Sequence, residues 1–325
     1  MLKLKYLFEN YDLAKECLKL YDADDRSLDK LLTYFRISSN AIYPFRSSST
    51  GKVCVLRLSP IEEKPETEVS SEIQLINWLI ERGFPAMKPY PMRDGRLCAV
   101  VETAWGTYNV SCFEKVSGET LEDCDGSLEL IWGYGRTLGQ LHEHMKRYPY
   151  AETRRDHAAL MDEIRRRFTA YNAPAALLTE WESVDRELAG LPITPECYGV
   201  VHYDFEADNV LYCDETDTYG VIDFDDAIRC WYTLDLTRAI DCLDDVAEDV
   251  PGDAAQAAFL SGYREVCPFT QEQEATMPLM RRLVRLQEYA TILHVLSEPP
   301  DFEPEWMTEI IANLRHRLRM IENSI

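Results

Sequence analysis

Apolar residues follow different spacings along the first third of the chain. Leu, Tyr and Ala recur at helical spacing over residues 1–22, and residues 40–60 read as two strands joined by a Ser- and Gly-containing turn. The segment 66–85 has apolar residues three and four positions apart and ends with Gly and Pro, which predicts a helix with its stop signal. Residues 96–116 favour strands again. The pattern therefore predicts a small β-rich region that contains one prominent helix.

The character of the sequence changes after residue 116. A turn at 117-SGETL-121 is followed by a helical apolar stripe over 128–148, and the chain from about residue 253 onward is again helical by pattern. There is no internal repeat and no low-complexity linker. The sequence therefore predicts an α+β protein of two lobes, with a β-rich lobe at residues 1–116 and a larger, mainly helical lobe at residues 117–325.

The second lobe contains a predicted hairpin surrounded by acidic residues. Two short apolar runs, 210–212 and 221–222, flank a stretch of turn residues. A hairpin here brings Asp204, Asn209 and Asp223 to one end of a rigid platform. Because few basic residues lie near them in the sequence, we expect a cation from outside the chain to balance the carboxylates. Carboxylate and amide oxygens suit a hard cation such as Mg²⁺, completed by waters and substrate phosphates.

Charge narrows the range of partners. The chain has 57 acidic against 34 basic residues and a formal net charge of −23. This balance disfavours nucleic acid and anionic membranes, which are bound by Lys and Arg, and it fits a cationic or metal-complexed ligand. The alternative is that much of the charge simply forms a solvated surface.

Cysteine usage and hydropathy indicate the compartment. The ten cysteines are scattered, with no C-x-x-C pair, and are expected to be reduced packing thiols. The N-terminus lacks the long apolar segment of a signal peptide, and no later apolar run approaches the roughly 18 residues of a membrane span. We therefore expect a cytoplasmic protein. Its oligomeric state cannot be read from the sequence, although exposed apolar helix faces could serve a dimer.

The hairpin region resembles a known catalytic loop. His202-x-Asp204-x-x-x-x-Asn209 has the spacing of the protein-kinase loop in which the Asp accepts a hydrogen bond from the acceptor hydroxyl and the Asn holds a metal ion. Asp223-Phe224 looks like the start of the kinase metal-binding motif, and the acidic run through Asp226 makes the match closest to the aminoglycoside phosphotransferase and choline kinase-like family. The resemblance implies a bilobal protein-kinase-like fold.

Positions in the first lobe follow the order of the same family. Arg57 stands where a strand supplies a cation to the nucleotide phosphates, and Glu72 resembles the acid that pairs with it. Arg57 could instead be a strand residue that reaches the surface, and Glu72 an ordinary helix acid. The nucleotide-covering loop offers Ser39 and its neighbours in place of repeated Gly, so phosphate binding by backbone amides is a weaker expectation there.

The remaining matches lie at the hinge and beyond it. The segment 112–121 looks like the hinge, whose backbone near Glu114 and Val116 would bond the adenine edge, and 138-LGQLHEH-144 matches a helix found before the catalytic loop. Asp235 resembles the buried acid that braces this loop. Tyr203 departs from the family, which frequently has Gly between the His and the Asp.

The resemblance implies an ATP- and Mg²⁺-dependent phosphotransferase, with GTP as an alternative donor, that acts on a hydroxyl of a small molecule. Asp204 would orient and deprotonate the acceptor, and Asn209 and Asp223 would hold the metal. The acidic segment 241–253, together with the aromatic residues Trp231, Tyr232 and Tyr263, suits an aminated acceptor such as an amino sugar, amino alcohol or amino acid. The alternative is that this segment is a solvated acidic loop.

Several alternatives stay open from the sequence alone. A homoserine-kinase-like metabolic enzyme would share every residue named above and differ only in the acceptor pocket. A non-catalytic pseudokinase would bind nucleotide without turnover, and the intact Asp204, Asn209 and Asp223 argue against it. A divalent-metal hydrolase would need more metal-ligating His than the sequence shows.

Overall fold

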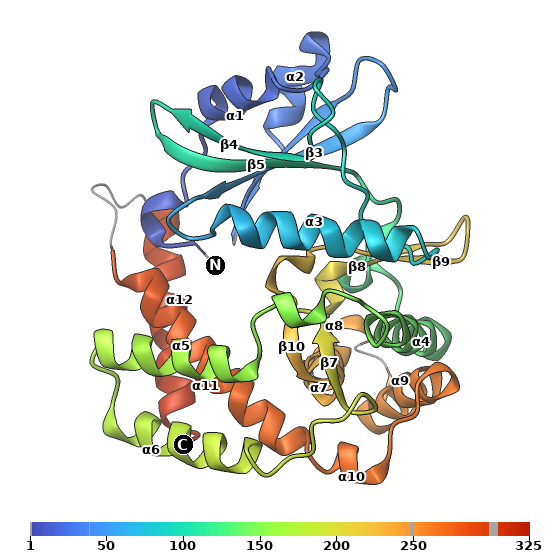
Figure 1. Ribbon diagram of the computed structural model, residues 1–325, viewed down its shortest axis with the longest axis vertical. Coiled ribbons are helices and arrows are strands. Elements are labelled where there is room, and N and C mark those ends of the chain that lie inside the picture. The colour runs from blue at the N-terminus through green and yellow to red at the C-terminus, as the bar shows by residue number, and fades with distance from the viewer. Residues whose placement is uncertain (1, 39, 248–249, 299–304) are drawn as a thin grey trace.

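The protein has two lobes in a computed structural model that describes residues 2–38, 40–247, 250–298 and 305–325 (Figure 1). A sheet with flanking helices forms the upper lobe in this view, and a mainly helical lobe lies below it. The α+β architecture of two lobes expected from the sequence is confirmed. None of the described helices is long and apolar enough to cross a membrane.

A five-stranded antiparallel sheet with strand order β1-β2-β3-β5-β4 forms the centre of the upper lobe. Its strands are β1 Arg36–Ile37, β2 Ala41–Arg46, β3 Val53–Pro60, β4 Cys98–Thr103 and β5 Gly106–Glu114. Helices α1 Tyr11–Leu18 and α2 Asp25–Leu32 contribute to a core with the sheet. Helix α3, Glu66–Ile80, runs between the sheet and the lower lobe (Figure 1).

Helix α3 begins and ends where the sequence indicates. Pro65 precedes its first turn, where a missing N–H costs no hydrogen bond, and Glu66 and Glu68 place negative charge at its N-terminus. After the helix, Gly83 adopts a positive φ of 83°, a conformation that glycine reaches without steric strain. The chain can therefore turn sharply toward Phe84, whose N–H returns to the carbonyl of Leu79 at 3.1 Å.

The lower lobe is built from helices around short strands. Its helices are α4 Leu128–Met145, α5 His157–Ala170, α6 Ala175–Leu188, α7 Thr233–Asp241, α8 Leu243–Val246, α9 Gly252–Val266, α10 Gln271–Glu274, α11 Met277–Leu296 and α12 Glu305–Glu322. Its strands are β7 Tyr198–Val201, which pairs with β10 Ile228–Trp231, and β6 Glu119–Thr120, β8 Val210–Cys213 and β9 Thr218–Val221, which form a small sheet. Single 3₁₀ turns are η1 Leu4–Tyr6, η2 Leu121–Asp123, η3 Ala151–Thr153, η4 Ala207–Asn209 and η5 Phe224–Asp226.

Glycines let α4 and α9 pack with their backbones in close contact. A Cβ atom added at Gly135 would lie 2.0 Å from the carbonyl oxygen of Phe259, and one added at Gly262 would lie 1.9 Å from that of Trp132. Neither position has space for a side chain. The close contact fixes α4, which carries part of the support for the catalytic loop.

Two expectations about local structure need correction. Residues 1–22 do not form one helix, because the chain forms the turn η1 and then starts α1 with Asn10 as its N-cap. The return strand of the hairpin ends at Val221, so Asp223 does not end it; Asp223 lies beyond the strand in a left-handed conformation, with φ of 64°.

Candidate active site

A buried carboxylate holds the predicted catalytic loop in place. Asp235 of α7 is fully buried and accepts hydrogen bonds from the backbone N–H groups of His202 at 2.7 Å and Tyr203 at 2.8 Å. The Nε2 atom of His142 on α4 lies 3.1 Å from the same carboxylate. Tyr203 has a positive φ of 77°, which is unusual for a bulky residue and is maintained here by these bonds.

His142 is neutral in this network. Burial lowers its pKa, against the raising effect of Asp235. Because the carboxylate of Asp235 can only accept, Nε2 of His142 carries the proton, and Nδ1 accepts from the hydroxyl of Tyr263 at 2.8 Å. His142 is therefore a buried residue that supports the predicted catalytic loop through Asp235.

Asp204 and Asn209 are in direct contact. The Asn209 Nδ2 atom donates to the backbone carbonyl and to Oδ2 of Asp204, both at 3.0 Å. Since both neighbours are acceptors, the amide nitrogen must face them. The Oδ1 atom of Asn209 accepts no hydrogen bond from the described residues, so it can serve as an oxygen ligand.

Asp204 also has a cationic partner that sequence reasoning missed. The Nη2 atom of Arg238 on α7 lies 2.6 Å from Oδ1 of Asp204 and 2.8 Å from Oε1 of Glu206. The sequence did carry a signal, because Arg238 follows Asp235 by three residues in a helix, which puts both on the same face.

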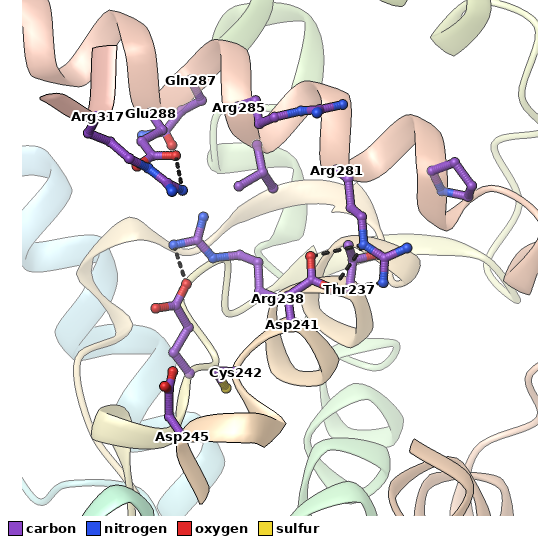
Figure 2. Close-up of a pocket in the computed structure, with 13 residues that line it drawn as sticks. Thr237, Arg238, Asp241, Cys242, Asp245, Arg281, Arg285, Gln287, Glu288 and Arg317 are labelled. Carbon is purple, nitrogen blue, oxygen red and sulfur yellow. Dashed lines mark hydrogen bonds and ion pairs between the residues drawn. The ribbon is translucent and has the colours of Figure 1, made fainter. Parts of the chain in front are cut away.

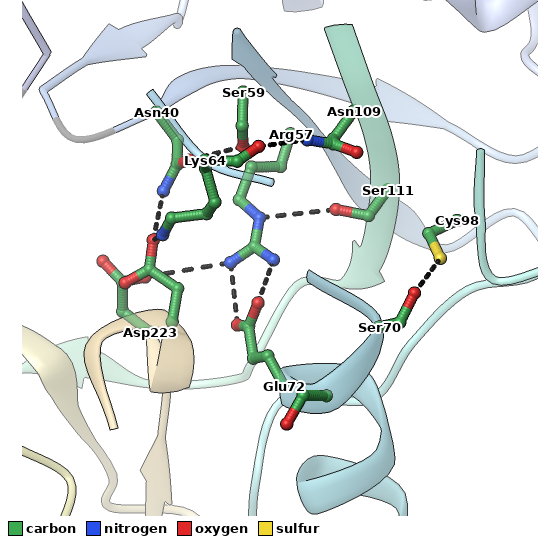
Figure 3. A network of polar contacts seen from close by, with 12 residues as sticks. Asn40, Arg57, Ser59, Lys64, Ser70, Glu72, Cys98, Asn109, Ser111 and Asp223 are labelled. Atoms are coloured by element: carbon green, nitrogen blue, oxygen red, sulfur yellow. Dashed lines mark hydrogen bonds and ion pairs between the residues drawn. The ribbon is translucent and has the colours of Figure 1, made fainter. Parts of the chain in front are cut away.

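The first lobe contributes a buried ion pair. Arg57 on β3 and Glu72 on α3 are 2% and 0% exposed, and the Arg57 guanidinium binds the Glu72 carboxylate with both terminal nitrogens, Nη1 at 2.8 Å (Figure 3). Nε of Arg57 donates to the hydroxyl of Ser111 at 3.3 Å, and the guanidinium lies 4.8 Å from the ring centroid of Phe113. Arg57 and Glu72 are therefore both buried, and the alternative that they lie at the surface is wrong.

Arg57 contacts the second lobe. Its Nη1 atom lies 3.9 Å from Oδ1 of Asp223. Burial and then the neighbouring Asp225 raise the pKa of Asp223 well above its ordinary value, and Arg57 only partly offsets this. The backbone N–H of Ile222 donates to the carbonyl of Asn209 at 3.0 Å, so the two predicted metal ligands lie on adjoining backbone segments.

Asp225 is bound by the first lobe. Lys64 forms an ion pair with it, and the Asn40 side chain donates to its Oδ2 atom at 2.8 Å. Burial opposes its ionisation, but Lys64 and Arg57 hold the pKa of the Asp225 carboxyl below its ordinary range.

The expectation that the acidic cluster lacks basic partners in the chain is therefore wrong. Arg57, Lys64 and Arg238 all reach it, from positions far away in the sequence. Among the described residues, these bases leave two groups less compensated: the Asp223 carboxyl, whose nearest ion-pair partner is Arg57 at 3.9 Å, and the side-chain oxygen of Asn209.

These two groups fit a hard divalent cation. Mg²⁺ prefers oxygen ligands and is commonly held by one or two protein groups, with waters and phosphates completing its shell. Within the described part of the chain, no three acidic, His or Cys side chains gather as a complete metal site. The role of Asn209 and Asp223 as metal ligands, completed by a substrate, remains a prediction.

The predicted hinge, residues 112–121, connects the two lobes. The carboxylate of Glu114 is occupied by Lys52 at 2.6 Å and Lys88 at 3.1 Å, so its side chain is not free for a nucleotide. The backbone N–H of Val116 has no backbone acceptor among the described residues. The Val116 side chain fills the space above Gly220, where an added Cβ would meet it at 2.3 Å.

Two sequence expectations find no support in the structure. Ser39 lies outside the described residues, so its place in the nucleotide-covering loop stays a prediction. The aromatic residues expected on the acceptor wall, Trp231, Tyr232 and Tyr263, are instead 1–3% exposed and buried in the core. The prediction that they offer cation–π contacts to an acceptor is wrong.

Known proteins match this architecture. A family model described as "Phosphotransferase enzyme family" matches residues 38–269. The amicoumacin kinase of Bacillus subtilis is 22% identical over 60% of this chain and 58% of its own length, and the homoserine kinase of Neisseria meningitidis serogroup B is 26% identical over 73% and 74%.

Solved structures show the same fold. An amicoumacin kinase in complex with AMP-PNP, Ca²⁺ and Ami has a TM-score of 0.77 at 19% identity and covers 97% of this chain and 94% of its own. A microcompartment-associated aminopropanol kinase has a TM-score of 0.67 at 22% identity over 96% and 97%. The family match spans more than half of the sequence. The chain therefore belongs to the phosphotransferase enzyme family and is a phosphotransferase that acts on hydroxyl groups of small molecules.

Proposed function

We propose that the protein transfers the γ-phosphoryl group of ATP, with Mg²⁺, to a hydroxyl of a small aminated molecule. GTP is the alternative donor. The nucleotide binds between the lobes, with the backbone near Glu114 and Val116 on its adenine edge, and Arg57 aligns its phosphates. Asp204 receives the acceptor hydroxyl, and Asn209 and Asp223 hold the metal ion.

One observation carries the proposal. A buried Arg57–Glu72 pair on the first lobe faces Asp223 on the second at 3.9 Å, and the residue before Asp223 is hydrogen-bonded to the backbone of Asn209, which in turn contacts Asp204. Ion pairs in the interior have a large desolvation cost and often add little stability, so a pair aimed at an under-compensated carboxylate favours a role in ligand binding.

The chain contributes mainly positioning and charge. Asp235 fixes the backbone of the catalytic loop, and Asn209 and Arg238 fix the two oxygens of Asp204. The Asp204 carboxylate accepts the hydrogen bond of the acceptor hydroxyl and takes its proton as the oxygen attacks phosphorus. When bound, the magnesium ion neutralises charge on the phosphates. Arg57 is held by Glu72 and offers its positive charge on the opposite side of the cleft.

The related proteins support an aminated acceptor. Three of them are a homoserine kinase, an aminopropanol kinase and an amicoumacin kinase, and homoserine and aminopropanol each carry both an amine and a hydroxyl. The amicoumacin kinase in complex with AMP-PNP and Ca²⁺ supports a nucleotide with a divalent cation for the same fold.

Thermal unfolding tests the nucleotide part of the proposal. The protein is titrated with ATP, GTP and ADP, each with and without Mg²⁺, and the melting temperature is recorded. Ligand that binds only the native state raises it by mass action, so we expect a Mg²⁺-dependent rise. Absence of any rise at millimolar nucleotide contradicts the proposal. A rise with no phosphoryl transfer to any acceptor favours a nucleotide-binding protein without catalysis.

A further inference from the structure

A cavity of about 640 Å³ lies beside the catalytic loop in the lower lobe (Figure 2). Its walls come from α7, α8, α11 and α12. Arg238 lines this cavity and also binds Asp204 at 2.6 Å, so the cavity begins one side chain away from the proposed catalytic carboxylate. Its size is in the range of small-molecule sites. A molecule bound here would contact Arg238, which in turn binds Asp204.

The walls of this cavity carry equal numbers of acidic and basic side chains. Four carboxylates and four guanidinium groups line it: Glu206, Asp241, Asp245, Glu288, Arg238, Arg281, Arg285 and Arg317. The acidic segment 241–253 therefore does not give a purely negative wall, because arginines from α7, α11 and α12 face it. A site that is selective for cations alone would not be built in this way.

Most of these charges are already paired. Arg238 binds Glu206 at 2.8 Å, Arg281 binds Asp241 at 2.7 Å, and Arg317 binds Glu288 with one contact at 2.9 Å. Each of these pairs satisfies one acid and one base of the wall. One side chain of each sign is then left over.

The two remaining charges are Asp245 on α8 and Arg285 on α11. Neither forms an ion pair or a side-chain hydrogen bond with any residue in the described ranges. In Figure 2 they lie on opposite sides of the cavity, with Arg238 between them. A ligand that spans this cavity therefore meets a carboxylate at one end and a guanidinium at the other.

We propose that the acceptor is a zwitterion, a small hydroxyl compound with an ammonium group that faces Asp245 and a carboxylate that faces Arg285. This inference rests on the proposed function and narrows its acceptor class. An amino alcohol or amino sugar would satisfy Asp245 only and would leave Arg285 without an anion. Guanidinium binds carboxylate in a planar, two-pronged geometry, which makes Arg285 the recognition group for the anionic end.

Matched acceptors separate the two ends of the ligand. L-homoserine carries both charges, 3-aminopropan-1-ol lacks its carboxylate, and 4-hydroxybutyrate lacks its ammonium group. L-serine and ethanolamine form a second pair, and a hydroxyl-containing dipeptide with glucose extends the panel to larger zwitterions and to a neutral acceptor. ADP release with Mg²⁺ and ATP gives kcat/KM for each. We expect the zwitterions to exceed their singly charged partners by at least about tenfold, as one charged hydrogen bond predicts.

Single substitutions assign the selectivity to the two side chains. Arg285→Gln should lower kcat/KM for the zwitterion about 10- to 100-fold and leave the carboxylate-free partner nearly unchanged. Asp245→Asn should lower kcat/KM for the zwitterion by a similar factor and leave kcat/KM for the ammonium-free partner nearly unchanged. Arg315→Gln, at an exposed position of α12 that does not line the cavity, is the matched control and should leave kcat/KM unchanged for both acceptors.

Three results would overturn the inference. They are a preference for an acceptor without a carboxylate, unchanged selectivity in Arg285→Gln, and no turnover of any zwitterion while Mg²⁺ and nucleotide still bind. These differ from failure of the proposed function itself, in which nucleotide neither binds nor is turned over.

Discussion

The Nη2 atom of Arg238 lies 2.6 Å from the Asp204 carboxylate and 2.8 Å from that of Glu206. One guanidinium nitrogen thus holds two acids of the catalytic loop, and the guanidinium also lies 5.4 Å from the ring centroid of Tyr203. Burial works against its charge, but Asp204 and Glu206 keep the pKa of Arg238 above its ordinary value. Arg238 is therefore a positioning residue for Asp204.

Replacing Arg238 tests this role. Arg238→Gln should lower kcat by about 10- to 100-fold, because the Asp204 carboxylate loses its fixed orientation and lies near an unbalanced Glu206. The KM for nucleotide should change little, since Arg238 binds Asp204 and Glu206 and none of the residues assigned to the nucleotide. Arg238→Lys keeps the charge and should recover part of kcat. Steady-state kinetics check both variants. An equal fall of kcat in Arg238→Gln and Arg238→Lys would point to a purely structural role.

The Arg57–Glu72 pair makes a prediction about stability. Glu72→Gln leaves the buried Arg57 without its carboxylate and should lower the free energy of unfolding by about 3–5 kcal/mol. Glu66→Gln removes an exposed acid from the same helix and should change it by less than about 1 kcal/mol. Denaturant unfolding compares the two. The nucleotide-dependent rise in melting temperature should also be smaller in Glu72→Gln, and similar values for both variants would contradict this account.

His142 predicts a pH dependence of stability. Burial lowers its pKa in the folded protein below the ordinary value of 6.5, so the unfolded chain binds a proton first as the pH falls. The free energy of unfolding should therefore decrease as the pH falls through about 6.5, by up to about 1.4 kcal/mol per pH unit from this group. His142→Gln lacks the group and should show a shallower slope between about pH 7.5 and 5.5. Parallel slopes in denaturant unfolding would rule out this contribution.

Local sequence was enough to predict the hairpin and the loop before it. Asp204 and Asn209 are five residues apart, and a spacing this short can be converted into contact without knowledge of the rest of the fold. The pairing of Arg57 with Glu72, 15 residues apart on a strand and the next helix, came instead from the family resemblance. The family pattern supplied the roles that the spacing alone does not give.

Contacts between distant segments could not be predicted in this way. Lys64 and Asp225 are 161 residues apart, and nothing in either neighbourhood indicates their ion pair across the cleft. The sequence of the acidic segment 241–253 does not indicate that arginines of α11 and α12 lie opposite it, because only the packing of the helices brings them to the same cavity. The burial of Tyr232 and Tyr263 has the same cause, because aromatic residues in an amphipathic segment fit both a core and a binding wall.

Replacement of Asp204 tests the central claim most directly. Phosphoryl transfer to the best acceptor of the panel and calorimetric binding of nucleotide with Mg²⁺ are measured for the native protein, Asp204→Asn and Asp214→Asn, an exposed acid on the hairpin turn. Asp204→Asn should lose at least about a thousandfold in kcat and keep its nucleotide affinity within a few fold, and Asp214→Asn should match the native protein. Retained turnover in Asp204→Asn, or loss of its nucleotide binding, would contradict the account.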